Sequence, residues 1–353
     1  MAYQNVGTPR FYINSIEFLT SNGVNPDVLQ PYTGNDVFPT DAIFKTIPTP
    51  DLSEPSLPAE GYDFSNLPTG VLTGKCFVAI LGHKLKTEDR HFRLMEGGGS
   101  SETIEPRYQN IVNADTSGDL KPEYDGFSIV GFDYNNDNNS LWVDVSSNAT
   151  GQSLILGNYW DCPHSADLSM TLTRDYSNIK TIETKSGFTL SNDFGSSNPK
   201  WGNLPAWDLA ESQDADPAVL ANLSKSGRRV WDLSFSYLQD SDVFGSNQSI
   251  GNNHSGRWYP TITTSGYESE DLHYSDFYSY GFNDNVLTDD SFYSQVIHKT
   301  NGGQLPFIFQ PDGGGGVVRA GNNNSDQFAI CKFDSGFSFQ QIAPNLYSVK
   351  MKI

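Results

Sequence analysis

The sequence predicts an all-β protein with few short helices, and three observations support this fold class. Only 18% of the residues are charged and 13% are aromatic, and 32 are glycines. Short strands joined by Gly, Asn, Ser and Pro turns use residues in this way, whereas helical proteins need more Ala, Glu, Lys and Leu. The aromatic residues recur within alternating runs, which argues against a disordered chain. We expect two β-sandwich or jelly-roll-like domains and an extended N-terminal arm.

The chain of 353 residues is long enough for two hydrophobic cores, and its patterns divide it into three parts. Residues 1–70 are predicted to form an N-terminal strand, within 9–19, followed by a Pro-rich extended arm. Residues 71–165 are predicted to form a jelly-roll β-sandwich, which the strand at 9–19 joins. Residues 166–353 are predicted to form a second β-rich domain with an aromatic insert at 250–288.

The N-terminal part begins with one regular element and then loses any period. Residues 9–19, PRFYINSIEFL, indicate a strand that runs into a short turn of helix ending near Gly23. In residues 24–70, the run TIPTPDLSEPSLPAEGYDFSNLPTG has neither a helical nor a strand period. We expect an extended arm that lies on another surface, and the alternative is a disordered linker. Spaced apolar residues favour docking of the arm: Phe38, Ile43, Phe44, Ile47 and Leu57.

Short apolar runs separated by turn residues predict the strands of both domains. The first set is KCFVAILGHKL, HFRLM, GFSIVGFDY, SLWVDV and QSLILGNYW. The second set, from residue 167 on, is LSMTLTRDY, KTIETKSGFTL, RRVWDLSFSYL, PFIFQPD, QFAICKF and NLYSVKMKI. Residues 230–238 alternate cleanly between polar and apolar, so we expect one aromatic and aliphatic face on that strand. The members of this face are Trp231, Leu233, Phe235 and Tyr237.

Two short helices are expected in the C-terminal half. In DPAVLANLSK, residues 216–225, Asp216 is placed to cap the N-terminus and Pro217 occupies the first helical position. The second helix is DDSFYSQVIHKT, residues 289–300, with Gly302 beyond its end. Its predicted apolar side consists of Phe292, Val296 and Ile297.

The charge of the chain limits the partners that we expect. A formal net charge of −20 repels phosphate backbones and anionic lipid, so we expect neither nucleic acid as a partner nor insertion into a membrane. The sequence shows no basic and apolar leader and no apolar run long enough to span a bilayer.

The cysteines indicate the compartment of synthesis. Cys76, Cys162 and Cys331 are odd in number and far apart, and two of them lie in apolar strand-like runs. This pattern predicts buried free thiols rather than a disulfide framework, and therefore synthesis in a reducing cytoplasm.

The run GFDYNNDNNSLWVDV, residues 131–145, places hard oxygen ligands at the spacing of a calcium-binding loop. The calcium candidates are Asp133, Asn135, Asp137 and Asp144. An EF-hand has glycine at the sixth position, where this chain has Asn138, and it is flanked by helices rather than strands. Since Asn and Asp also dominate hairpin turns, we favour a polar hairpin turn between two strands over a metal site.

No other motif predicts reaction chemistry. The histidines, such as His83, His91 and His164, lack the CxxC or HxxxH spacing of zinc ligands, and structural roles are favoured for them. Neither a G-x-S-x-G nor an HExxH motif occurs. The runs GGGSSET and DGGGGVV lack the G-K-[S/T] of a phosphate loop, which favours turns. We therefore expect a protein that is not an enzyme, with no catalytic residue and no cofactor.

Residues 257–285 are the strongest recognition candidate in the sequence, because aromatic residues alternate there with carboxylates and serines. The aromatic candidates are Trp258, Tyr259, Tyr267, Tyr274, Phe277, Tyr278 and Tyr280. Such a mixture can stack on sugar rings, but it also suits a seam between subunits, which we favour, or packing of the loop on itself. The carboxylates Glu268, Glu270 and Asp271 could also supply a glycosidase pair, although any acidic loop offers such pairs.

Several stretches resemble proteins of tailed bacteriophages. KCFVAILGHKL is similar to the strand that opens galactose-binding-like (discoidin-type) jelly rolls in such proteins, and SLWVDV followed by SLILGNYWDCPHSADLSMTL resembles their later strands. Further stretches resemble structural proteins of marine and cyanobacterial phage virions. They are KTIETKSGFTLSN, KWGNLPAWDL, GRRVWDLSFSYLQDSDVF, GGQLPFIFQPD, DQFAICKFD and APNLYSVKMKI.

The resemblance implies a structural subunit of the virion, made in the host cytoplasm. We expect a tail component, such as a distal tail, collar or minor tail protein, that assembles into a ring. Its partners would be copies of itself and other virion proteins, with residues 24–70 contacting a neighbouring subunit. The alternatives are an adhesion or receptor-binding module that uses residues 257–285 against host glycan, a capsid decoration protein, and a polysaccharide depolymerase.

Overall fold

The protein is described from a computed structural model. The described residues are 7–24, 27–28, 47–48, 60–63, 72, 74–81, 83, 85–86, 89–96, 102–103, 106–110, 112–114, 119–123, 126–134, 140–145, 153–167, 170–175, 179–193, 228–244, 286–287, 289–313, 322–323, 327–334 and 336–353. The all-β class is confirmed, because antiparallel sheets dominate these residues and the helical segments are few and short. The helical segments are α1 (Ser15–Ser21), α3 (Asp240–Val243), the π-helical η1 (Tyr293–Ile297) and the 3₁₀-helical η2 (His298–Thr300).

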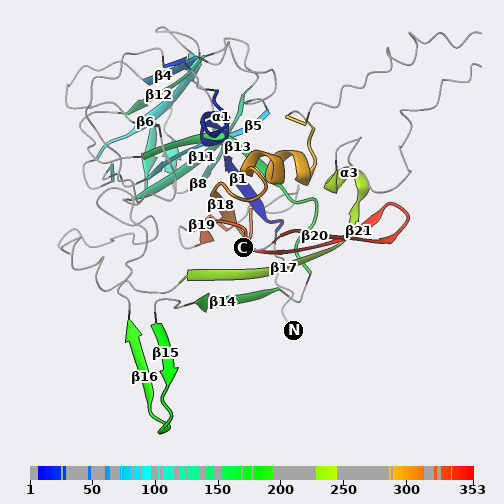
Figure 1. The fold of residues 1–353 in the computed structure, drawn as a ribbon. Coiled ribbons are helices and arrows are strands. Elements are labelled where there is room, and N and C mark those ends of the chain that lie inside the picture. The colour runs from blue at the N-terminus through cyan, green and yellow to red at the C-terminus, as the bar shows by residue number, and fades with distance from the viewer. Residues whose placement is uncertain are drawn as a thin grey trace, which may run out of the picture.

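Sheet A lies at the centre of the molecule (Figure 1). Its strands are β1 (Arg10–Asn14), β3 (Ile47–Pro48), β5 (Gly74–Leu81), β8 (Pro106–Asn110), β11 (Phe127–Tyr134), β13 (Ser153–Asp161), β18 (Phe307–Gln310) and β19 (Ala329–Cys331). Their order is β19-β18-β1-β13-β5-β11-β8, and β3 pairs with the beginning of β13. Strands from both sides of the predicted boundary at residues 165 and 166 therefore share one sheet. The division into two domains itself stays a prediction.

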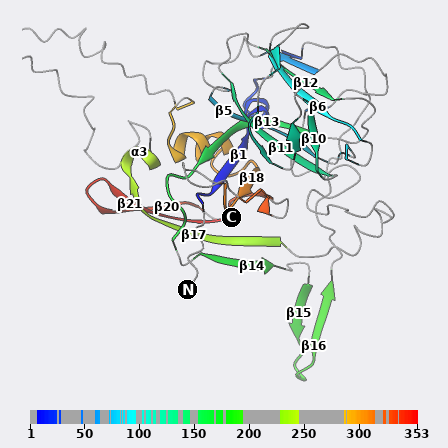
Figure 2. The same cartoon turned by 180° about the vertical axis from the view of Figure 1, so that it is seen from behind.

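Sheet B packs on sheet A in a sandwich-like arrangement. It contains β2 (Asp27–Val28), β4 (Glu60–Asp63), β6 (Phe92–Glu96), β7 (Glu102–Thr103), β9 (Val112–Ala114), β10 (Leu120–Pro122) and β12 (Ser140–Val145). Sheet C has the order β14-β17-β21-β20. Its strands are β14 (Thr171–Asp175), β17 (Arg228–Gln239), β20 (Ser338–Ala343) and β21 (Leu346–Lys352). A separate hairpin, β15 (Ile179–Glu183) with β16 (Thr189–Asp193), extends away from the body in both ribbon views (Figures 1 and 2).

One face of sheet A is shared by two hydrophobic cores. Over β5 and β11 it packs against sheet B and α1, with Val78 in contact with a cluster that includes Phe92. Over β1 and β18 it packs against sheet C and η1, where Phe11 shares a cluster with Trp231 and Val296. The opposite face carries a third core, drawn from β1, β5, β11, β13 and β18. The body is thus closed around buried aromatic and aliphatic side chains.

The strand and the short helix expected at residues 9–23 are confirmed. The side chain of Asn14 caps α1 by accepting a hydrogen bond from the backbone N–H of Glu17 at 3.1 Å. The helix ends before Gly23, whose φ of +79° suits glycine. Opposite Asn14, a Cβ atom at Gly157 would lie 1.8 Å from the carbonyl oxygen of Ile13, so only glycine fits there.

Two expectations for the second set of strands are wrong. Residues 180–190 do not form one strand, because the chain turns at Gly187, where φ is +82°, and returns as β16. On β17, Trp231 is 2% exposed as expected, but Tyr237 is 69% exposed. The register of β17 with β21 shifts between Phe235 and Leu238, and Tyr237 has a left-handed φ of +63°. This irregularity turns Tyr237 outward, and Leu238 occupies the buried side in its place.

One expectation about connections is wrong, and part of the predicted arm pairs with its own chain. Residues 46–70 contain β3 and β4, and together with β2 these short strands tie the predicted arm to sheets A and B of its own chain. Residues 131–145 do not form a hairpin, since β11 pairs with β5 and β8 whereas β12 pairs with β4 and β6. This segment connects the two layers of the sandwich instead.

The helix expected at 289–300 is present as η1 followed by η2, and its apolar side is confirmed. Phe292, Val296 and Ile297 are all buried against sheet C and β1. Asn301, with a left-handed φ of +51°, and Gly302 end the helical segment. The other predicted helix, at 216–225, lies outside the described residues.

Candidate functional site

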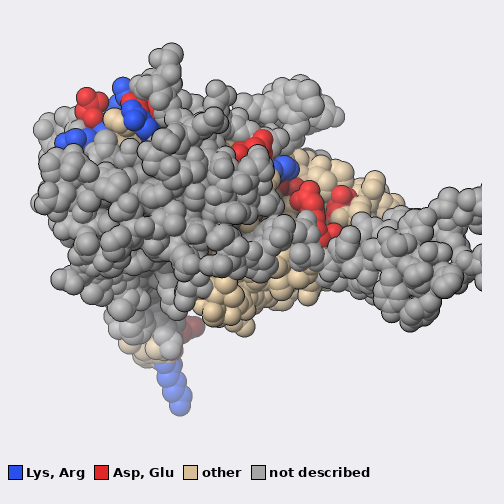
Figure 3. All heavy atoms as spheres, turned by 90° about the horizontal axis from the view of Figure 1, so that it is seen from above, with Lys and Arg blue, Asp and Glu red and all other residues tan. Residues whose placement is uncertain are grey.

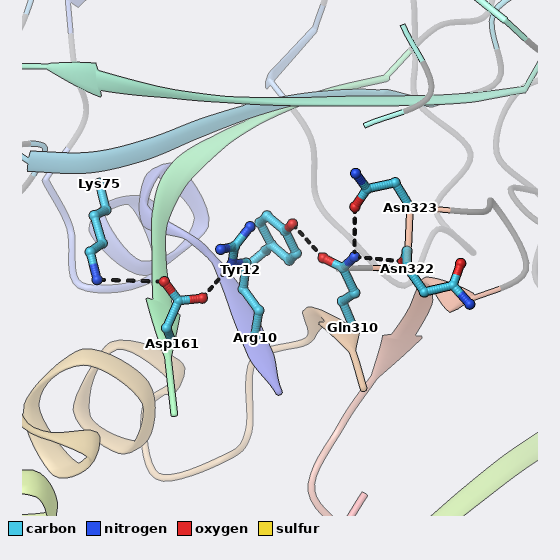
Figure 4. A network of polar contacts seen from close by, with 7 residues as sticks. All are labelled: Arg10, Tyr12, Lys75, Asp161, Gln310, Asn322 and Asn323. Atoms are coloured by element: carbon cyan, nitrogen blue, oxygen red, sulfur yellow. Dashed lines mark hydrogen bonds and ion pairs between the residues drawn. The ribbon is translucent and has the colours of Figure 1, made fainter. Parts of the chain in front are cut away.

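A polar network crosses the centre of sheet A and is the first place to look for chemistry (Figure 4). The Nε atom of Arg10 donates to Asp161 at 2.5 Å, and Lys75 Nζ lies 3.5 Å from the other carboxylate oxygen. Tyr12 donates its hydroxyl proton to Gln310 at 2.8 Å. Each of these groups has a partner on another strand, so the network joins β1, β5, β13 and β18.

The network extends to the chain beyond β18, which supports a structural role. The side-chain amide of Gln310 donates to the carbonyl of Asn322 at 2.9 Å and to the side chain of Asn323 at 3.2 Å (Figure 4). The Arg10 guanidinium lies 4.5 Å from the ring centre of Tyr159, a favourable cation–π geometry. These contacts fix segments that are far apart in sequence.

The buried thiols are poor nucleophiles. Cys76, Cys162 and Cys331 are free and buried, as the sequence predicted. Burial raises the pKa of Cys76 and of Cys331 to about 12, and it also raises the pKa of Cys162. Since the thiolate is the reactive form, these three groups stay protonated and unreactive near neutral pH.

A buried lysine lies near Cys76. Lys299 is 1% exposed and donates to the side-chain oxygen of Gln295 at 2.8 Å. Burial lowers its pKa to about 8, although the nearby Cys76 and Asp290 favour the charged form. Burial likewise raises the pKa of Asp290. The hydrogen bond of Lys299 to Gln295 thus lies within the helical segment, and the charge of Lys299 interacts with Cys76 of β5.

The histidines differ in their surroundings. His83 is buried, and its Nε2 lies 2.9 Å from the hydroxyl of Ser128, while its Nδ1 accepts from the backbone N–H of Leu85 at 3.3 Å. The structural role expected for it is confirmed. His91 lies 3.4 Å from Asp119, and His164 is exposed.

The exposed apolar side chains are unevenly distributed. Of the eight large apolar residues that are exposed among the described residues, five lie within residues 170–190. They are Met170, Leu172, Ile182, Phe188 and Leu190. Single exposed apolar residues are ordinary, but a contiguous group marks an interaction surface. We call the β15–β16 hairpin, residues 179–193, the projecting segment.

The register of the hairpin places three of these side chains on one face. Ile182 lies directly opposite Leu190, and the backbone N–H of Thr184 donates to the carbonyl of Phe188 at 2.8 Å. Side chains two residues apart on a strand share a face, so Phe188 joins Ile182 and Leu190. These three are 70%, 57% and 60% exposed. The adjacent residue Thr189 lies on the other face and is exposed too.

Most of the residues predicted to act as sites lie outside the described residues. This is true of Asn135, Asp137, Glu268, Glu270 and Asp271, and of all seven aromatic candidates, Trp258, Tyr259, Tyr267, Tyr274, Phe277, Tyr278 and Tyr280. Asp133 is exposed on β11, and Asp144 is on β12. In the described part of the chain no group of three potential metal ligands occurs.

Comparison with known proteins yields no relative: no family model, curated protein or solved structure matches the chain. Within the described ranges, no helix has the length and apolar character needed to cross a bilayer. The resemblance to phage proteins therefore remains an expectation from the sequence.

The exposed hairpin was not predicted from the sequence, although the sequence contains a signal for it. Ser186 and Gly187 form a turn dipeptide between two strand-like runs, which is a hairpin signature. Every second residue of a strand lies on the same face, so steps of two residues from the turn place Ile182 and Leu190 on one face of the hairpin. The period alone does not show that this face lacks a cover, because that depends on where the rest of the chain lies.

Proposed function

We propose that this chain is a non-enzymatic structural subunit of a tailed-phage virion, most consistent with a tail component that assembles into a ring. The observation that supports assembly is the projecting segment, which extends away from the body (Figure 1) and carries three exposed apolar side chains. The phage assignment rests on the resemblance of the strand sequences. The polar network and the buried thiols add support, because their groups are engaged in internal contacts.

The structure changes which segment we assign to assembly. The predicted arm contributes β2, β3 and β4 to the sheets of its own chain, so its removal would disturb sheets A and B. The projecting segment makes no such contribution to the two large sheets, because β15 and β16 pair only with each other among the described strands. We therefore assign the first subunit contact to residues 179–193.

The test is the presence and position of the chain in intact particles. Particles purified from a host that produces the chain are analysed by mass spectrometry and by negative-stain imaging with a gold-labelled antibody against it. We expect several copies per particle and label confined to the tail. Absence of the chain from intact particles, or turnover of a substrate by the purified chain, would contradict the proposal.

A further inference from the structure

We infer that the apolar face of the β15–β16 hairpin binds a second copy of this chain, with the hairpin of one copy lying on the body of the next. This inference rests on the proposed structural role and names the partner of the projecting segment. It commits to the three side chains Ile182, Phe188 and Leu190 as the apolar contact. Lys185, exposed at the turn of the hairpin, is the charged contact.

The described residues of the body leave the apolar face of the hairpin largely exposed. A two-stranded hairpin is marginally stable in water, and a third strand or a packed surface is normally required. Here the three apolar side chains of one face are each more than half exposed. The hairpin extends away from sheet C in both ribbon views (Figures 1 and 2). Its apolar face is therefore available to another molecule.

The distribution of charge favours a second copy as that molecule. Residues 170–193 contain three basic and three acidic residues and so are neutral, and the rest of the chain carries the whole net charge of −20. Two copies repel each other through most surfaces, but not through this segment. Between its strands the turn, residues 184–187, has Lys185 as its one charged residue. A basic turn is complementary to the acidic body of another copy.

Acidic side chains are present on the side of the molecule away from the hairpin (Figure 3). Figure 3 views the molecule from the side opposite to the hairpin of Figure 1, and the described acidic side chains visible there gather mostly near the middle of the view. Among the described acidic residues, Asp289 and Asp290 are close enough for their charges to interact. A contact between opposite sides of two copies is heterologous, and repetition of it closes a ring when the rotation allows.

The experiment uses the full chain and two adjacent residues on opposite faces of the hairpin. Leu190→Lys places a charge on the apolar face, and Thr189→Lys places the same charge on the other face. Self-association is measured by sedimentation over a range of concentrations. Loss of one buried leucine corresponds to about 10- to 100-fold weaker association, and burying a charge adds to this. We expect Leu190→Lys to weaken association by about 100-fold or more and Thr189→Lys to leave it within about 3-fold of the wild type.

A second measurement identifies the partner directly. The native thiols are buried, so Ser186→Cys, which keeps Lys185, carries the single exposed cysteine among the described residues and accepts a photo-crosslinker. We expect irradiation to trap a second copy of the chain. Crosslinking to a different virion protein, a monomeric wild type, or equal association of Leu190→Lys and Thr189→Lys would overturn the inference. None of these outcomes contradicts the proposed virion role, because that role is tested by the presence of the chain in particles.

Discussion

The body and the projecting segment are built from the same kind of strands, but they bury their apolar faces in different ways. In the body, β1 has both faces covered, and Phe11 and Tyr12, which point to opposite sides, are fully buried. In the hairpin, Phe188 is 70% exposed although it lies on a regular two-stranded ladder. Pairing of backbones is thus present in both regions, while side-chain burial is present in only one. Because a two-stranded hairpin without a cover is only marginally stable in water, we expect the hairpin to be less stable than the body.

The largest expected effect comes from glycine substitutions, which separate the two regions. Gly157→Ala brings a Cβ atom into the backbone of Ile13 and Ser15, so we expect a loss of about 4 kcal/mol or more in the free energy of unfolding. Gly187→Ala meets no neighbouring atom, and its left-handed φ of +82° costs only about 1 kcal/mol, locally in the hairpin.

The measurement for this pair is denaturant unfolding followed by tryptophan fluorescence, to which the buried Trp160 and Trp231 contribute. Gly157→Ala should shift the midpoint strongly or fail to fold, and Gly187→Ala should leave the midpoint unchanged. Equal shifts for the two variants would show that the hairpin unfolds together with the body.

The next largest effect is expected in the polar network, where Arg10 and Lys75 both pair with the carboxylate of Asp161. Arg10→Met removes a side chain that is 7% exposed and leaves Asp161 with Lys75, so we expect a loss of about 3 kcal/mol. Lys75→Met removes a side chain that is 41% exposed, and solvent screening limits the loss to about 1 kcal/mol or less. Denaturant midpoints at constant slope measure both losses. A larger loss for the Lys75 variant would contradict the structural role of Arg10.

The smallest effect is the pH dependence that Lys299 confers on the body. Its pKa in the folded chain is about 8, below its usual value of 10.5, so the unfolded chain binds this proton more tightly between these pH values. The contribution of Lys299 to stability therefore improves as the pH rises from 8 to 10.5. Below pH 8 the buried charge of Lys299 is unfavourable. Lys299→Met removes this cost but also the hydrogen bond to Gln295, so we expect a net stabilisation of about 1–2 kcal/mol.

The measurement is the difference in unfolding free energy between Lys299→Met and the wild type at pH 7 and at pH 10. We expect this difference to fall as the pH rises. Taking the difference is necessary because the raised pKa values of Cys76 and Cys331, about 12, destabilise both chains above pH 9. Lys185→Met, which removes an exposed lysine of the hairpin, is the control and should show no such trend. A constant difference for Lys299→Met would contradict the inferred cost of burial.

The sequence predicts the central strands of the body better than the strands and contacts around them, for physical reasons. Strands such as β5 and β11 are continuous apolar runs, so their burial can be read locally. By contrast, β20 has little regular alternation, and its pairing with β21 depends on the turn at Asn345, where φ is +61°. The contact of β18 with β1 joins residues almost 300 positions apart, and no local pattern specifies it. For that reason the sharing of sheet A across the predicted boundary was not foreseen.

The candidate site was less predictable than the fold, because exposure is a property of the whole arrangement. The alternation around Tyr237 is regular in the sequence, but the irregular pairing of β17 turns this side chain into solvent. The alternation in the hairpin is regular too, and its apolar face lacks a cover among the described residues. Regular alternation thus accompanies buried side chains at Trp231 and Phe235 and exposed ones in the hairpin.

The most direct test of the assembly contact is amide hydrogen exchange of residues 179–193 in the full chain at low and at high protein concentration. If a second copy covers the apolar face, these amides exchange quickly in dilute solution and become protected as the concentration rises, while the amides of β1 and β5 stay protected throughout. Exchange of the hairpin that is independent of concentration would contradict the assignment of this face to a second copy.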